Sequence, residues 1–110
     1  MEREFIETNT FVNNWHELNL TDENLRELQN FMMKNPKVGD IIKKTGGLKK
    51  LRWTLQNKGK SGGARVLFID FVSYGKIILV NCYSKDMKDD LTDKEKAIYK
   101  KLIKEIKKEL

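Results

Sequence analysis

The chain has 110 residues, 39% hydrophobic and 35% charged, which predicts one folded domain over residues 1–110 rather than a disordered chain or two domains. A core of this size is too small to enclose a haem, flavin or dinucleotide, and one cysteine is too few for a disulfide framework or a multi-cysteine zinc site. The N-terminal residues lack a signal-peptide pattern and no apolar run approaches ~18–20 residues, so we expect a cytoplasmic protein that does not contact a membrane.

Positive charge is concentrated in the middle of the chain. Residues 1–40 contain 4 basic and 8 acidic side chains, residues 41–85 contain 10 and 1, and residues 86–110 contain 8 and 7. The net charges of these segments are therefore −4, +9 and +1. A basic middle segment favours a face that binds a polyanion, and a merely soluble basic surface is the alternative.

The first forty residues predict a short strand followed by two helices. Residues 3–8 form the expected strand, Thr10 is the expected cap of the first helix, and Thr21 begins the second helix, which ends at Asn35–Pro36. Apolar side chains recur three or four residues apart in both helices: Phe11, Trp15 and Leu18, then Leu25, Leu28 and Met32. We expect these two helices to pack as a hairpin.

After a loop over residues 39–47, the hydrophobic period changes to two. Strands are expected from residues 48 to 55, 64 to 72 and 76 to 83, joined as an antiparallel meander through the glycine-rich residues 57–63 and a turn at residues 73–75. Thr92 and Glu95 form a capping box, and the helix behind it carries one apolar side: Ile98, Leu102, Ile106 and Leu110. The fold class is therefore α+β, with helices expected on one face of the sheet and only side chains on the other.

Three features that could indicate a metal or a nucleophile have simpler interpretations. His16 is the one histidine, which excludes a paired-histidine mechanism, and we expect it at the surface or in packing. Asp86, Asp89 and Asp90 lie among lysines before a helix, as a solvated loop does. Cys82 is expected as a small buried hydrophobe. We therefore predict no metal and no cofactor.

The remaining candidates are cations around one tyrosine: Arg52, Lys58, Lys60, Arg65, Tyr83 and Lys85. In an antiparallel meander the start of the Arg65 strand lies beside the end of the Tyr83 strand, so these residues can gather at one edge of the sheet. Arginine can hold two phosphate oxygens, a lysine among other cations can act as acid or base, and tyrosine can stack on a base or donate a proton. A phosphate-binding surface without catalysis would use the same residues.

Three segments carry a resemblance to a known family: NPKVGD at residues 35–40, TGGLKKLR at residues 45–52 and KGKSGGARV at residues 58–66. Together with YSK at residues 83–85 and the lysine-rich helix, the chain resembles the RelE/ParE toxin superfamily over residues 3–108, and specifically its HigB-like branch. The resemblance implies a RelE-like fold. It also implies a type II toxin that cuts translated mRNA in the A site of the 70S ribosome and so inhibits translation.

The family reaction is a metal-independent endoribonuclease reaction, in which the RNA 2′-hydroxyl attacks the adjacent phosphate and leaves a cyclic phosphate and a free 5′-hydroxyl. The resemblance assigns catalytic roles to Lys58, Lys60 and Arg65, with Tyr83 or Lys85 as the C-terminal contribution. Contacts to RNA and ribosome are expected from a second group: Lys43, Lys44, Lys49, Lys50 and Arg52. Some relatives use a histidine near the last strand, where this chain has none, so the resemblance does not identify the general acid.

The implied partners are a HigA-like helix-turn-helix antitoxin, the 70S ribosome and mRNA, with operator DNA bound only through the antitoxin complex. Two other functions stay open. One is a non-catalytic, phage-derived nucleic-acid-binding module. The other is an inhibitor of DNA gyrase like the ParE branch, although that branch lacks the basic cleavage cluster.

Overall fold

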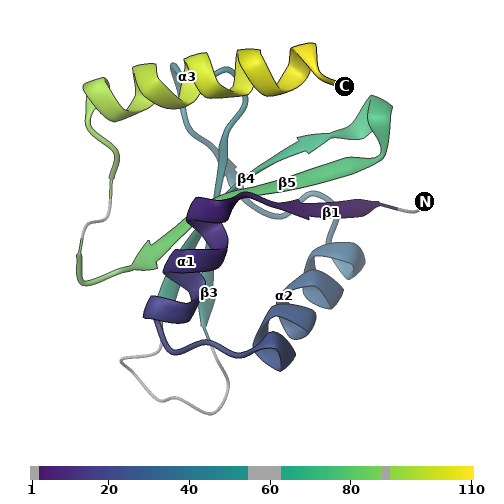
Figure 1. Cartoon of the computed structure of the whole chain (residues 1–110), viewed down its shortest axis with the longest axis vertical. Helices are drawn as coiled ribbons and strands as arrows, with labels where there is room; N and C mark the ends of the chain where they lie inside the picture. Colours follow the sequence, from purple (N-terminus) through teal and green to yellow (C-terminus); the bar gives the residue numbers. More distant parts are fainter. Residues whose placement is uncertain (1–2, 55–62, 88–89) are drawn as a thin grey trace.

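The computed structural model describes residues 3–54, 63–87 and 90–110 (Figure 1). Its elements follow in chain order: β1 (Glu4–Glu7), α1 (Asn9–Glu17), α2 (Asp22–Lys34), β2 (Asp40–Ile41), β3 (Lys49–Thr54), β4 (Gly63–Phe71), the 3₁₀ turn η2 (Val72–Tyr74), β5 (Lys76–Ser84) and α3 (Asp93–Lys108). This order matches the predicted one, except that the short strand β2 lies within residues 39–47, where we expected only a loop. The α+β class is confirmed.

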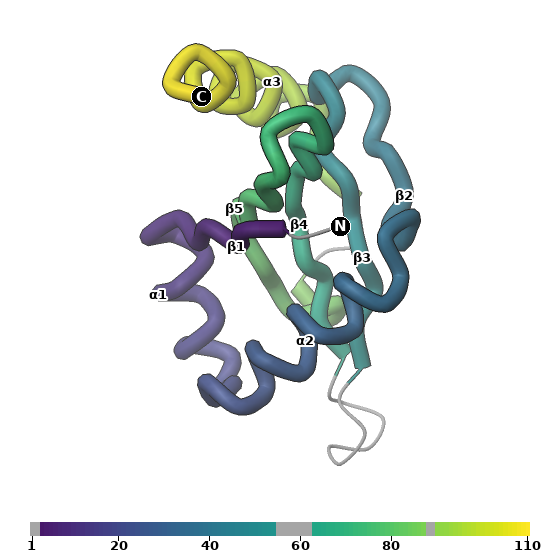
Figure 2. Tube along the Cα trace, turned by 90° about the vertical axis from the view of Figure 1, so that its right-hand side faces the viewer, coloured from purple at the N-terminus to yellow at the C-terminus, as the bar shows by residue number. Residues whose placement is uncertain are grey.

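The described strands form one mixed sheet in the order β1-β5-β4-β3-β2 (Figure 2). The pairs β3–β4 and β4–β5 are antiparallel, as the meander predicts. The sequence did not predict the direction of the first strand: β1 pairs with β5 in parallel, which makes the sheet mixed. Two helices separate β1 from the rest of the sheet, so no tight turn constrains its direction.

Helices cover both faces of the sheet, which corrects the expectation that one face has only side chains over it. In Figure 1, α3 lies at the top of the view, and α1 and α2 lie in its lower half, on either side of β3. On the α1–α2 face, Trp15 and Leu28 belong to the same core as Val66 of β4. On the α3 face, Ile103 shares a core with Leu67 of β4. The nearly continuous apolar run of β4 needs this double cover, because alternate side chains point to opposite faces.

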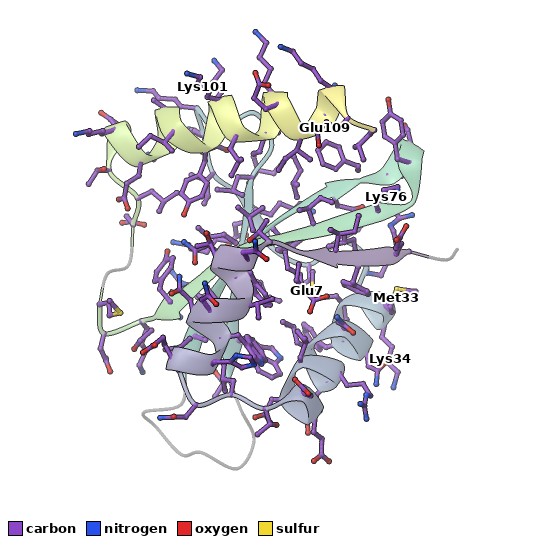
Figure 3. The ribbon with its side chains drawn as sticks, in the orientation of Figure 1. Glu7, Met33, Lys34, Lys76, Lys101 and Glu109 are labelled. Atoms are coloured by element: carbon purple, nitrogen blue, oxygen red, sulfur yellow. The ribbon has the colours of Figure 1, made fainter. Side chains whose placement is uncertain are left out.

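The side of α3 that faces the sheet differs from the predicted stripe. Tyr99, Ile103, Ile106 and Leu110 belong to or pack against the α3-face core. Ile98 and Leu102 are 59% and 38% exposed, so their assignment to the buried side is wrong. Because an α-helix turns about 100° per residue, a strict four-residue spacing drifts around the helix, whereas spacings of four, three and four stay on one side. Lys101 points away from the sheet (Figure 3).

A threonine hydroxyl caps the N-terminus of α1, of α2 and of α3. The capping box of Thr92 and Glu95 is confirmed, and Thr21 caps α2 as expected. The cap of α1 is Thr8 rather than Thr10: its hydroxyl accepts the N–H of Phe11 at 3.0 Å. The same hydroxyl donates to the carbonyl of Val80 at 2.7 Å, so this cap also joins α1 to β5.

Candidate functional site

Three of the predicted site residues form a row across the three central strands of the sheet, β3, β4 and β5. Arg65 of β4 directly opposes Arg52 of β3 on one side and Tyr83 of β5 on the other. Directly opposed residues on neighbouring strands have their Cβ atoms about 4.5–5.5 Å apart. The sheet thus makes neighbours of Arg52 and Arg65, which are more than ten positions apart in the sequence. It also makes neighbours of Arg65 and Tyr83. We call these three residues the Arg–Arg–Tyr row.

All three side chains of the row lie on the α3 face. Arg65 has the same strand parity as Leu67, which packs in the α3-face core. Arg52 lies between Leu51 and Trp53, which pack in the opposite core, so it points away from them. Tyr83 is itself a member of the α3-face core. Along the strands, the row lies near the end of the sheet where β3 and β5 end and β4 begins.

A β-bulge in β5 lies just before Tyr83. On β4 the consecutive residues Leu67 and Phe68 oppose Asn81 and Leu79, so Val80 is an additional residue on β5. Such a bulge shifts the alternation of all later side chains by one position.

The bulge decides which face Tyr83 occupies. Before the bulge, Ile77 and Leu79 pack on the α1–α2 face, and after it Cys82 does so. Unbroken alternation from Leu79 would place Tyr83 on the α1–α2 face, away from Arg65. With the additional residue, Tyr83 lies on the α3 face instead. Bulges that redirect a side chain are frequent beside active sites.

Lys85 and Lys50 bring two further cations to the α3 face. A Cβ added at Gly63 would lie 3.2 Å from Cδ of Lys85, so the missing side chain of Gly63 leaves room for the lysine stem. Lys50 lies two residues before Arg52 on the same face. Its Nζ is 3.3 Å from a carboxylate oxygen of Asp90, whose side chain is 88% exposed, against 12% for Lys50. The site thus has an acidic neighbour just before α3.

The phenol of Tyr83 is held in its protonated form. Only 6% of the residue is exposed, and this burial is the main reason that the pKa of Tyr83 is raised above its ordinary value. The positive charge of Arg65 lowers that pKa in part, and the nearby Tyr99, Asp90 and Glu95 raise it further. At neutral pH the phenol is therefore a proton donor rather than a base.

Of the predicted RNA- and ribosome-binding lysines, Lys50 lies on the same face as this row, whereas Lys43, Lys44 and Lys49 lie apart from it. Lys49 lies on the opposite face, where its Nζ is 5.9 Å from the ring centroid of Phe68 and 3.4 Å from the carbonyl oxygen of Val38. Lys43 and Lys44 are exposed in the segment before β3, at the opposite end of that strand from Arg52. Lys58 and Lys60 lie outside the described residues.

Three residues of the site were missed by sequence analysis: Asn81, Asp90 and Tyr99. Asn81 interrupts the otherwise apolar strand β5, which is the signal that could have identified it. Asp90 was considered only as part of an acidic loop, and nothing in the sequence indicated its ion pair with Lys50. Tyr99 lies one position from the predicted stripe of α3.

His16 and Cys82 lie where we expected, and Asp89 lies outside the described residues. His16 is exposed on α1. Cys82 is buried, which raises the pKa of its thiol to about 12 and leaves it unreactive at neutral pH. Among residues 3–54, 63–87 and 90–110, no three His, Cys, Asp or Glu side chains lie close enough to hold a metal ion. In the same part of the chain, no helix is sufficiently long and apolar to cross a membrane.

A comparison with protein families gives one match that covers nearly the whole chain. The family model described as the RelE toxin of the RelE / RelB toxin-antitoxin system matches residues 4–109. The matched range includes every element of the fold and the complete Arg–Arg–Tyr row.

Proposed function

The chain belongs to the RelE toxin family of a toxin–antitoxin system, and we propose that it is a ribosome-dependent endoribonuclease that cuts translated mRNA in the ribosomal A site. The Arg–Arg–Tyr row is the observation that carries this proposal. Two arginines in directly opposed positions destabilise a sheet, because like charges at that separation repel. A phosphodiester bound between them would relieve that repulsion, which gives the costly arrangement a purpose.

Two members of the row, Arg65 and Tyr83, have the chemistry that phosphodiester cleavage needs. The RNA 2′-oxygen forms a bond to phosphorus while the bond from phosphorus to the 5′-oxygen breaks, leaving a cyclic phosphate. Arg65 donates hydrogen bonds to the phosphoryl oxygens, whose negative charge grows in the transition state. Tyr83 gives its proton to the departing 5′-oxygen, since its raised pKa keeps the phenol protonated.

Lys58, Lys60 and Lys85 are the candidates for the base that takes the 2′-hydroxyl proton. Arg52 and Lys50 hold the RNA backbone beside the reacting phosphate. These cations supply the positive charge that a metal ion supplies in other nucleases, so we propose that the reaction is metal-independent.

Family membership implies an antitoxin partner, and we propose a HigA-like helix-turn-helix protein in that role. Operator DNA would be bound through the antitoxin complex. The substrate is mRNA on the 70S ribosome in the cytoplasm, where the ribosome orients the RNA for a small enzyme. Lys43, Lys44 and Lys49, which lie apart from the row, would contact the ribosome rather than the reacting phosphate.

A reconstituted translation reaction with the purified chain tests this function. We expect cleavage of a translated mRNA within its coding region, with 2′,3′-cyclic phosphate and 5′-hydroxyl ends, and little cleavage of the same RNA without ribosomes. A phosphorothioate at the scissile position should slow cleavage, and Mn²⁺ should not restore the rate. Restoration by Mn²⁺ would contradict the metal-independent reaction.

The same preparation distinguishes the two alternative functions. Intact mRNA with ribosome co-sedimentation would support a non-catalytic binding module. Intact mRNA with inhibition of DNA supercoiling by gyrase would support a ParE-like activity.

A further inference from the structure

Two side chains, those of Thr8 and Asn81, form hydrogen bonds with the backbone of the β5 bulge. A bulge removes ladder hydrogen bonds from the backbone, so the freed groups need other partners. The carbonyl of Val80 accepts the Thr8 hydroxyl at 2.7 Å, and the N–H of Cys82 donates to Oδ1 of Asn81 at 2.8 Å. The Asn81 side chain thus supplies a hydrogen-bond partner for a backbone N–H beside the bulge.

Asn81 also connects the two helical layers that cover the sheet. Its Oδ1 accepts a second hydrogen bond, from Nδ2 of Asn14 in α1, at 2.7 Å. Its Nδ2 donates to the hydroxyl of Tyr99 in α3 at 2.9 Å. All of these groups are partly buried, where an unmade hydrogen bond is costly. The amide of Asn81 therefore fits the bulged conformation and would lose its partners if β5 became regular.

We propose that Asn81 is a positioning residue, which holds the β5 bulge and thereby keeps Tyr83 on the same face as Arg65. The inference rests on the proposed function, in that the rate of RNA cleavage is the consequence of this placement. Asn81 does not itself contact the RNA. Its effect on the rate is transmitted through the conformation of β5 to Tyr83, two residues later.

Two substitutions separate the hydrogen bonds of Asn81 from its volume. Asn81→Leu keeps a similar size and removes every side-chain hydrogen bond. Asn81→Asp keeps the oxygen that accepts from Cys82 and Asn14, and its other oxygen can accept the proton of the Tyr99 hydroxyl. We expect Asn81→Leu to lower the single-turnover cleavage rate about a hundredfold, because misplacing a catalytic group has an effect of this size. The ribosome concentration that gives half-maximal cleavage should be unchanged. We expect Asn81→Asp to restore most of the rate.

A double-mutant cycle with Tyr83→Phe tests the route of this effect. If Asn81 acts through Tyr83, adding Asn81→Leu to Tyr83→Phe lowers the rate by no more than about twofold, whereas independent effects would multiply. Leu25→Ala, a half-buried position on α2, is the control for loss of stability alone. This variant should have a lower melting temperature, and its cleavage rate should be unchanged when it is measured well below that temperature.

NMR of tyrosine labelled with ¹³C at Cζ reports the position of Tyr83 without any RNA. The chain has three tyrosines, so each resonance can be assigned by substitution with phenylalanine. We expect the Tyr83 resonance to move in Asn81→Leu and to stay in place in Asn81→Asp and Leu25→Ala. A folded Asn81→Leu protein with an unmoved Tyr83 resonance would overturn the proposal, as would multiplicative rate losses in the cycle. If the chain cut no mRNA at all, the proposed function would fail and the NMR result would still decide the role of Asn81.

Discussion

Replacing Arg65 by alanine should abolish most of the catalysis and leave most of the ribosome binding. Arg65 lies between Arg52 and Tyr83 in the row, so its guanidinium can reach the phosphate whose departing 5′-oxygen Tyr83 protonates. Removing one preorganised donor to a developing negative charge costs about 3–4 kcal/mol, which is roughly a hundred- to thousandfold in rate. Arg65→Lys keeps the charge but cannot form the bidentate hydrogen bonds of a guanidinium. This variant should therefore lose about 1.5–3 kcal/mol of transition-state stabilisation, or roughly ten- to a hundredfold in cleavage rate.

The loss of Arg65 should also change the pH dependence of cleavage. Its positive charge lowers the pKa of Tyr83. In Arg65→Ala that pKa rises further, so the phenol stays protonated to a higher pH and the alkaline decline in rate moves upward. The phenol also becomes a weaker acid, which adds to the loss of rate at neutral pH.

Single-turnover cleavage at saturating ribosome, measured beside ribosome co-sedimentation, separates these effects. Arg26→Ala is the matched control, because it removes a guanidinium from the exposed side of α2. We expect Arg65→Ala to bind ribosomes within about tenfold of the wild type, since binding is shared among many phosphate contacts. Equal losses of binding and cleavage would make Arg65 a phosphate anchor without a role in the chemical step. A folded variant that cleaves at the wild-type rate would remove Arg65 from the site.

Three further predictions concern neighbouring residues. Tyr83→Phe should keep the fold, because the ring still packs in the α3-face core, and should lower the cleavage rate about 10²–10⁴-fold; an unchanged rate would exclude Tyr83 as the proton donor. Because the pKa of Cys82 is raised from 9.0 to about 12 in the folded state, the free energy of unfolding should fall as pH rises above 9, by about 1.4 kcal/mol at pH 10. Denaturant titrations should show this decline in the wild type and a weaker one in Cys82→Ala. Gly63→Ala should shift the Lys85 side chain slightly, since the new Cβ lies 3.2 Å from its Cδ, and should reduce the rate with little change in melting temperature; an unchanged rate would mean that the packing of Lys85 on Gly63 does not contribute to catalysis.

Much of the candidate site could be predicted because its residues are related by local pairing. Strands joined by short connections pair with their sequence neighbours, so the start of β4 had to lie beside the ends of β3 and β5. That argument was sufficient to predict that Arg52, Arg65 and Tyr83 lie at one end of the sheet, but not that Tyr83 lies on the same face as Arg65. Strand alternation likewise distinguishes Lys49 from Lys50, although we grouped the two lysines by charge alone.

The sequence by itself determined the order of the elements, the caps of α2 and α3 and the antiparallel meander, because hydrophobic period, capping and turn residues act over a few positions of the chain. Only the tertiary structure decided the parallel pairing of β1, the placement of α3 over the second face and the bulge at Val80 and Asn81. Each of these depends on contacts between distant segments: the Thr8 hydroxyl with Val80, and Asn81 with Tyr99. The tertiary structure also decided the face that Tyr83 occupies, because one additional residue in β5 reverses the alternation that local sequence would predict.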